Sequence, residues 1–133
     1  MFKIGLIVNP VAGIGGPAAL KGSDGDNIYQ HAKALGFESK SLQRASIVVN
    51  ALESLGSSVE FVTCSGAMGE DCVKGAPQQY SIVYSPDDLT HTQPQDTCKA
   101  TAAIMAVGVD IILFVGGDGT ARDVCSVVDN NQP

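Results

Sequence analysis

The sequence predicts an α/β protein with three layers, in which helices cover both faces of a parallel sheet. Short apolar segments typical of buried strands alternate with segments whose apolar residues recur every three or four positions, as in helices. Strands separated by helices run parallel within one sheet, and such a sheet needs helices on both of its faces. The 133 residues, 44% of them hydrophobic, are enough for one domain with its own core.

The first half of the chain is predicted to hold two strands and two helices. Residues 2–8 form an apolar strand, and a glycine-rich loop covers residues 10–26. Asp26 can cap a short helix from Asn27 to Leu35, which ends at Gly36. A longer helix over residues 42–55 ends at Gly56, and residues 59–63 form the second strand. The apolar positions of that longer helix are Leu42, Ala45, Val48, Val49, Leu52 and Leu55.

The segment after Thr63 is predicted to contain a short helix, a strand and a long helix. The short helix covers residues 68–73, and the strand covers residues 80–84. A polar loop, Ser85–Gln93, leads to the long helix. Thr92 and Gln95 have the spacing of a capping box, with Pro94 in the first turn, and Gly108 stops the helix after Val107.

The last strand is predicted over residues 110–115, as a buried strand whose residues 111–115 are all apolar, and the last helix over residues 121–128. We expect the strands to pair in the order set by adjacent right-handed βαβ units. Ligands of such sheets bind beyond the carboxyl ends of the strands. Four loops fall on that edge, namely Asn9–Gly16, Cys64–Gly69, Ser85–His91 and Gly116–Thr120.

Composition argues against several classes of protein. A net charge of −6 and a pI near 4.6 disfavour nucleic acid and anionic membranes as partners. No apolar run approaches the ~20 residues of a membrane span, and residues 2–8 are too short for a secretory signal. We therefore expect a cytoplasmic protein with reduced thiols. The cysteines lack the CxxC or Cys/His spacing of zinc sites, and no residue is assigned as a metal ligand.

The most informative motif is Gly116-Gly117-Asp118-Gly119-Thr120, between the last strand and the last helix. Glycines that lead from a strand into a helix let a phosphate meet backbone N–H groups. Asp118 would repel phosphates unless a metal ion or a transferable proton lay between them. Its expected role is therefore metal holding or proton abstraction. The alternative is a tight turn in which Asp118 or Thr120 caps the helix.

Other nucleotide-binding motifs fit less well. The glycine motif lacks the Gly-Lys-Ser/Thr of a Walker loop, and Arg122 stands at the third glycine position of a Rossmann fingerprint. Residues 13–18 match G-x-G-x-x-A, but Pro17 and a prolonged loop follow instead of a helix. Asp24 and Asp26 are expected to cap a helix rather than to hold Mg²⁺.

Gly-Gly-Asp-Gly-Thr after an apolar strand resembles the signature of the ATP-NAD kinase family, which is related to diacylglycerol and sphingosine kinases and more distantly to phosphofructokinases. Asn9-Pro10-Val11-Ala12-Gly13 after the first strand is similar to the first nucleotide-binding loop of this group. The longer pieces IGLIVNPVAGIGGPAALKGSDG and VGGDGTARDV look most like predicted polyphosphate- or ATP-dependent NAD kinases, near acetoin-catabolism protein X. Residues 40–95 carry little of the resemblance.

The resemblance implies a kinase that uses Mg²⁺ and moves a terminal phosphoryl group from ATP or polyphosphate to a ribose hydroxyl of NAD. Asp118 would accept or orient the hydroxyl proton. Gly116, Gly117 and Gly119 would bring backbone to the phosphates, and Thr120 would add a hydroxyl at the helix start. Asn9, in the neighbouring loop, would orient the nucleotide or Asp118. Arg122 could face phosphate, or it could pair with Asp123 or a neighbouring loop. The expected cofactor-binding positions are Asn9, Gly13, Gly116, Gly117, Gly119, Thr120 and Arg122.

The resemblance also implies that residues 1–133 are a nucleotide-binding α/β domain, either a fragment that lacks a β-rich second domain or a natural short paralogue. We expect the full-length protein to be a homo-oligomer and the fragment alone to be inactive. Two other functions stay open: a non-catalytic nucleotide-binding or regulatory protein of the acetoin type, and a lipid kinase-like domain. Acceptor contacts in the family lie mostly beyond Pro133, so the acceptor is not decided by this sequence.

Overall fold

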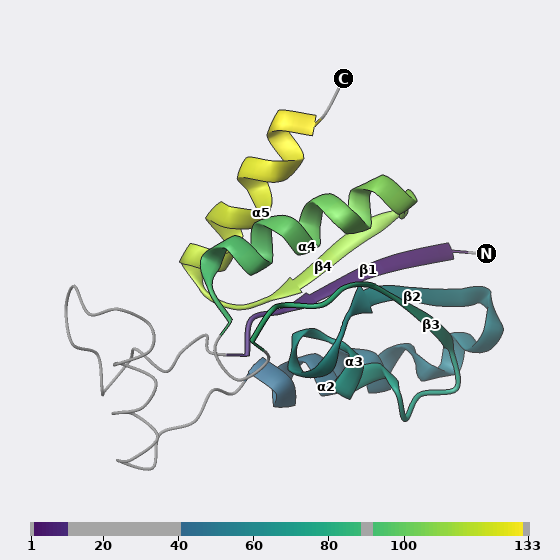
Figure 1. The fold of residues 1–133 in the computed structure, drawn as a ribbon. Helices are drawn as coiled ribbons and strands as arrows, with labels where there is room; N and C mark the ends of the chain where they lie inside the picture. The colour runs from purple at the N-terminus through teal and green to yellow at the C-terminus, as the bar shows by residue number, and fades with distance from the viewer. Residues whose placement is uncertain (1, 11–40, 89–91, 132–133) are drawn as a thin grey trace, which may run out of the picture.

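A computed structural model describes residues 2–10, 41–88 and 92–131 of the chain. The strands in these ranges form one four-stranded parallel sheet in the order β3-β2-β1-β4 (Figure 1). The α/β class and the parallel sheet predicted from the sequence are therefore confirmed. The strands are β1 (Phe2–Val8), β2 (Val59–Cys64), β3 (Gln79–Tyr84) and β4 (Ile111–Val115).

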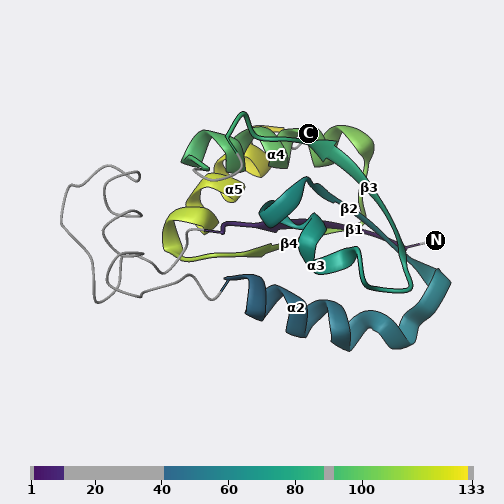
Figure 2. The same ribbon diagram turned by 60° about the horizontal axis from the view of Figure 1, so that its bottom comes forward.

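Helices cover both faces of the sheet. Figure 2 shows α2 and α3 on one side and α4 and α5 on the other, which gives three layers. The helices are α2 (Ser41–Leu52), α3 (Glu70–Val73), α4 (Pro94–Val107) and α5 (Asp118–Asn131). Short 3₁₀ segments, Glu53–Ser58 and Gly66–Met68, follow α2 and precede α3.

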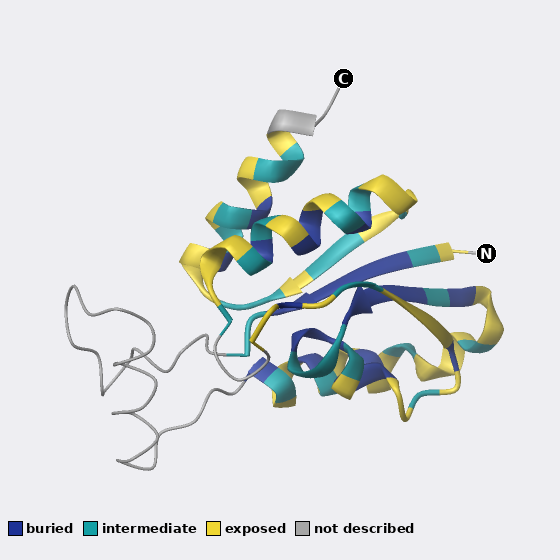
Figure 3. Cartoon of the chain, viewed as in Figure 1, coloured by how far each residue is buried: buried dark blue, intermediate teal, exposed yellow. Residues whose placement is uncertain are grey.

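The central strand β1 contributes to the cores on both faces, because its side chains alternate between them. Ile4, Leu6 and Val8 pack on the α2 side, and Ile7 packs on the α4 side. Figure 3 shows that the buried residues are concentrated on the central strands β1 and β2, with others on the helices. On the α2 side, β1 meets Ala45, Val49, Val59, Phe61, Cys72 and Val73; on the α4 side it meets Val62, Cys64, Met68, Ala100, Ile104 and Val124.

The close approach of α4 to β1 depends on Gly5, and this gives a stability prediction. A Cβ at Gly5 would lie 2.5 Å from Cγ2 of Ile104, so Gly5→Ala should lower the free energy of unfolding by about 1–3 kcal/mol in urea titrations. Ile104→Ala removes that methyl group and alone costs about 2–5 kcal/mol. The double variant should lose less than the sum of the two, because the new methyl occupies vacated space.

Gly75→Ala is the matched control, since no atom of the described residues lies within 4 Å of a Cβ built there. It should leave the urea midpoint almost unchanged. Strictly additive losses in the Gly5/Ile104 pair would contradict the close contact.

The position of β4 differs from the sequence prediction. β1, β2 and β3 are neighbours in chain order, but β4 crosses to the other side of β1 and becomes an edge strand. The prediction of a buried strand at residues 110–115 is therefore wrong, since Ile111 is 42% exposed and Phe114 is 37% exposed. A wholly apolar run indicates a strand, but it does not tell which strand lies beside it.

Several helix ends also differ from their predicted positions. The long helix was expected to reach Leu55, but α2 ends at Leu52, and Gly56 has a φ of 55° inside the following 3₁₀ segment. Val48 and Leu55, which fit the apolar period of the predicted helix, are 39% and 48% exposed. The helix expected over residues 68–73 is divided into a 3₁₀ turn and the short α3.

The capping box of α4 joins Gln93 and Asp96 rather than Thr92 and Gln95. Oδ2 of Asp96 accepts a hydrogen bond from the backbone N–H of Gln93 at 2.7 Å. The predicted helix Asn27–Leu35, the glycine-rich loop beyond Pro10 and His91 lie outside the described residues.

Candidate functional site

The glycine motif lies where the order of the sheet reverses. The chain runs from β1 to β2 on one side, and β4 returns to the other side of β1. In open parallel sheets, such a reversal leaves a crevice beyond the carboxyl ends of the two strands, and this is where ligands bind. Asn9 follows β1 at this point, and Gly116 follows β4.

Asn9 is bonded to both sides of the glycine motif. Its backbone N–H donates to the carbonyl oxygen of Val115 at 2.9 Å, which continues the pairing of β1 with β4. Its side-chain Nδ2 donates to Oγ1 of Thr120, also at 2.9 Å. The structure thus brings together two sequence-predicted residues that are far apart in the chain.

Helix α5 begins at Asp118, three residues earlier than predicted. The Ala121 N–H donates to the Gly117 carbonyl at 3.0 Å, so Gly117 holds the cap position and Asp118 and Thr120 lie inside the first turn. The interpretation of Asp118 or Thr120 as the helix cap is therefore wrong. The N–H groups of residues 118–120 have no acceptor within the helix, which makes this turn suited to an anion.

The three glycines of the motif have different surroundings. A Cβ at Gly116 would lie 2.3 Å from Oγ1 of Thr120, so this glycine is required by the fold itself. At Gly117 and Gly119, a Cβ would meet no atom of the described residues within 4 Å. Neither has a positive φ, so the backbone does not require glycine at these two positions.

The sequence matches the ATP-NAD kinase N-terminal domain over residues 4–133. The chain belongs to the ATP-NAD kinase family. The match covers both Asn9 and the glycine motif, so the crevice described above lies within the matched domain. No curated protein and no solved structure matches the chain.

Of the remaining predicted site residues of this ATP-NAD kinase domain, some lie within the described residues and one does not. Asp118 and Arg122 are exposed on the first turns of α5. Arg122 does not form an ion pair with Asp123 among the described residues. Gly13 lies outside those residues. The roles of all the site residues toward a ligand stay predictions.

Sequence reasoning missed a contact at the same sheet edge of the kinase domain. The hydroxyl of Tyr84, the last residue of β3, donates to Oδ1 of Asp96 in the first turn of α4 at 2.6 Å. Desolvation, followed by this hydrogen bond, raises the pKa of Tyr84, so the hydroxyl keeps its proton at neutral pH. The available sequence signal was Asp96, at the third position of the helix that follows the strand ending at Tyr84.

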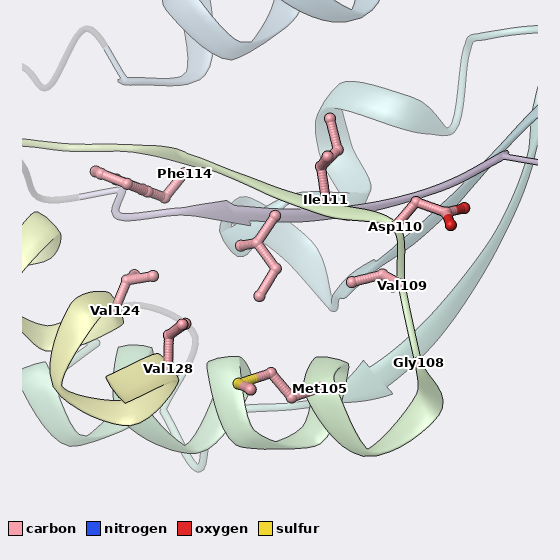
Figure 4. A pocket seen from close by; sticks show the side chains of 9 residues that line it. Met105, Gly108, Val109, Asp110, Ile111, Phe114, Val124 and Val128 are labelled. Atoms are coloured by element: carbon pink, nitrogen blue, oxygen red, sulfur yellow. The ribbon is translucent and has the colours of Figure 1, made fainter. Parts of the chain in front are cut away.

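A pocket of about 430 Å³ beside β4 is not part of this crevice. It lies between the edge strand and the helices α4 and α5, where Figure 4 shows Phe114, Val124 and Val128 around it. Asp110 is the one ionisable residue in its lining, and the Lys3 N–H donates to Oδ2 of that carboxylate at 2.7 Å. A largely apolar pocket with one carboxylate does not suit phosphates. The lining consists of Met105, Gly108, Val109, Asp110, Ile111, Ile112, Phe114, Val124 and Val128.

Within the described ranges of the kinase domain, no three His, Cys, Asp or Glu side chains gather where they could hold a metal ion. The four cysteines are free thiols. Burial raises the pKa of the Cys64 thiol to about 12, so it does not supply a thiolate. In these ranges no helix combines the length and apolar character needed to cross a membrane.

Proposed function

We propose that this domain binds the phosphates of a nucleotide in the crevice between β1 and β4, as part of a kinase that phosphorylates NAD to NADP. The observation that carries the proposal is that no atom of the described residues comes within 4 Å of a Cβ built at Gly117 or Gly119, on either side of Asp118. The described part of the fold does not require glycine at either position, and a ligand close to the backbone would explain the missing side chains. Membership of the ATP-NAD kinase family supports this explanation.

The first turn of α5 would receive the phosphates. Its N–H groups point out of the helix start, and the positive end of the helix dipole favours an anion there. Arg122, exposed one turn further along, would add a cation.

Asp118 is the proposed proton acceptor. A ribose hydroxyl of NAD would attack the terminal phosphorus, the new P–O bond would form as the bond to the leaving phosphate oxygen breaks, and the hydroxyl proton would pass to the Asp118 carboxylate. A bound Mg²⁺ would neutralise charge on the phosphates. Mg²⁺ is commonly bound largely through substrate phosphates and water, so it would not need Asp118 as a ligand while that carboxylate accepts the proton.

The proposal is tested on the full-length protein with Mg²⁺, NAD and either ATP or polyphosphate as donor. We expect NADP to form with at least one donor, measured with an NADP-specific dehydrogenase, and we expect the full-length protein to be a homo-oligomer. Nucleotide binding without transfer to any acceptor would instead favour a non-catalytic protein of the acetoin-catabolism X type. Transfer to diacylglycerol or a sphingoid base, but not to NAD, would favour a lipid kinase.

A further inference from the structure

Asn9 holds both ends of the loop that carries Asp118. Its backbone N–H is bonded to Val115, immediately before Gly116, and its side chain is bonded to Thr120, immediately after Gly119. The four residues between these points are Gly116, Gly117, Asp118 and Gly119. A single residue at the end of β1 therefore fixes where the loop leaves the sheet and where α5 begins.

Thr120 is shaped to serve this contact rather than a ligand. Its side chain is buried, with 3% of the residue exposed, and it lies directly under Gly116, where a Cβ would come within 2.3–2.8 Å of three of its atoms. Its hydroxyl oxygen accepts the hydrogen bond from Asn9. The absence of a side chain at Gly116 leaves the room that Thr120 occupies.

We propose that Asn9 and Thr120 are a positioning pair, here called the loop staple, that holds Asp118 and Gly119 in register with the end of β1. The staple reassigns Thr120 from a ligand contact to a residue that acts through its neighbours. Its catalytic consequence rests on the proposed function, since a misplacement of about 1 Å in a phosphoryl-transfer site can cost about 10²-fold in rate.

The first experiment compares Thr120→Val with Thr120→Ser in the full-length protein. Valine keeps the shape of threonine and removes the hydroxyl, so kcat should fall about 10- to 100-fold with a smaller change in KM for ATP. Serine keeps the hydroxyl and should restore most of the rate. Ser126→Ala is the matched control: it removes another α5 hydroxyl, which donates to the Asp123 carbonyl one turn back, and should leave kcat unchanged. Equal kcat in Thr120→Val and wild type would overturn the proposal.

The second measurement needs no substrate. Without the staple, the hydrogen-bonded amides of residues 121–124 in α5 should exchange with deuterium about 3- to 10-fold faster, the loss expected from one hydrogen bond. A double-mutant cycle of Asn9→Ala and Thr120→Val isolates the pair. The double variant should exchange no faster than the faster of the two single variants.

The outcomes separate this inference from the proposed function. A wild-type protein that forms no NADP contradicts the proposed function, whereas the exchange cycle still decides the staple. Additive effects of the two substitutions on exchange overturn the staple even in an active kinase. If Asn9→Ala does not fold, the comparison of valine with serine at Thr120, read by exchange of the same amides, decides instead.

Discussion

Asp118→Asn in the full-length enzyme should lower kcat by on the order of 10²–10⁴, the usual range for loss of a general base. Asparagine keeps the shape of the side chain and removes both the negative charge and the proton acceptor. The fold should survive, because Asp118 is exposed at the start of α5. Affinity for ATP should change little or increase, since a carboxylate near the phosphates is lost. Steady-state rates and ATP titrations measure the two effects separately.

Asp129→Asn is the matched control for this substitution. Asp129 is an exposed carboxylate on the same helix, far along the chain from the glycine motif, and its neutralisation should leave kcat unchanged. Near wild-type turnover in Asp118→Asn would contradict the catalytic assignment. The glycine motif would then be a binding element or a turn.

Alanine at Gly119 should separate ligand binding from stability. The position lies in the first turn of α5, and a Cβ there meets none of the described residues, so Gly119→Ala should raise the free energy of unfolding by about 0.4–1 kcal/mol. A methyl group forced against a bound phosphate costs about 1–3 kcal/mol, so affinity for ATP should fall about 5- to 150-fold. Urea titration and calorimetry test the two expectations.

Gly116→Ala is the contrasting variant. Its new Cβ would lie 2.3 Å from the Thr120 hydroxyl, so stability should fall by about 1–3 kcal/mol. If Gly119→Ala binds ATP as tightly as wild type, the space in front of that residue does not hold phosphate. That result would contradict the proposed function.

The strands could be predicted well from the sequence because their apolar runs are short and bounded by polar or glycine residues. β1 has the predicted limits, Phe2–Val8, and β2 and β3 differ by one residue at one end. Exposure was harder to predict. Val48 fits the helical period but is 39% exposed. The period identifies the apolar face of a helix, but it does not show how much of that face the sheet covers.

The candidate site could be predicted as a set of residues but not as an arrangement. Glycines and one acid after an apolar strand pointed to residues 116–120, and strand ends pointed to Asn9. The hydrogen bond of Asn9 to Thr120 could not be predicted, since no periodicity relates two residues 111 positions apart. Whether a Cβ can be accommodated at Gly116 and at Gly119 also depends on where α5 begins. This helix begins three residues before the expected start.

The place of β1 in the sheet has a consequence for how the protein forms during synthesis. β1 leaves the ribosome first, but one of its two partners, β4, begins only at Ile111. Until then β1 can pair on one side only, and the distant pairing that completes it makes folding slower than local contacts would. The crevice is therefore completed late in folding: a nascent chain that ends before β4 holds β1, β2 and β3, but it lacks the glycine motif and the second strand that bounds the crevice.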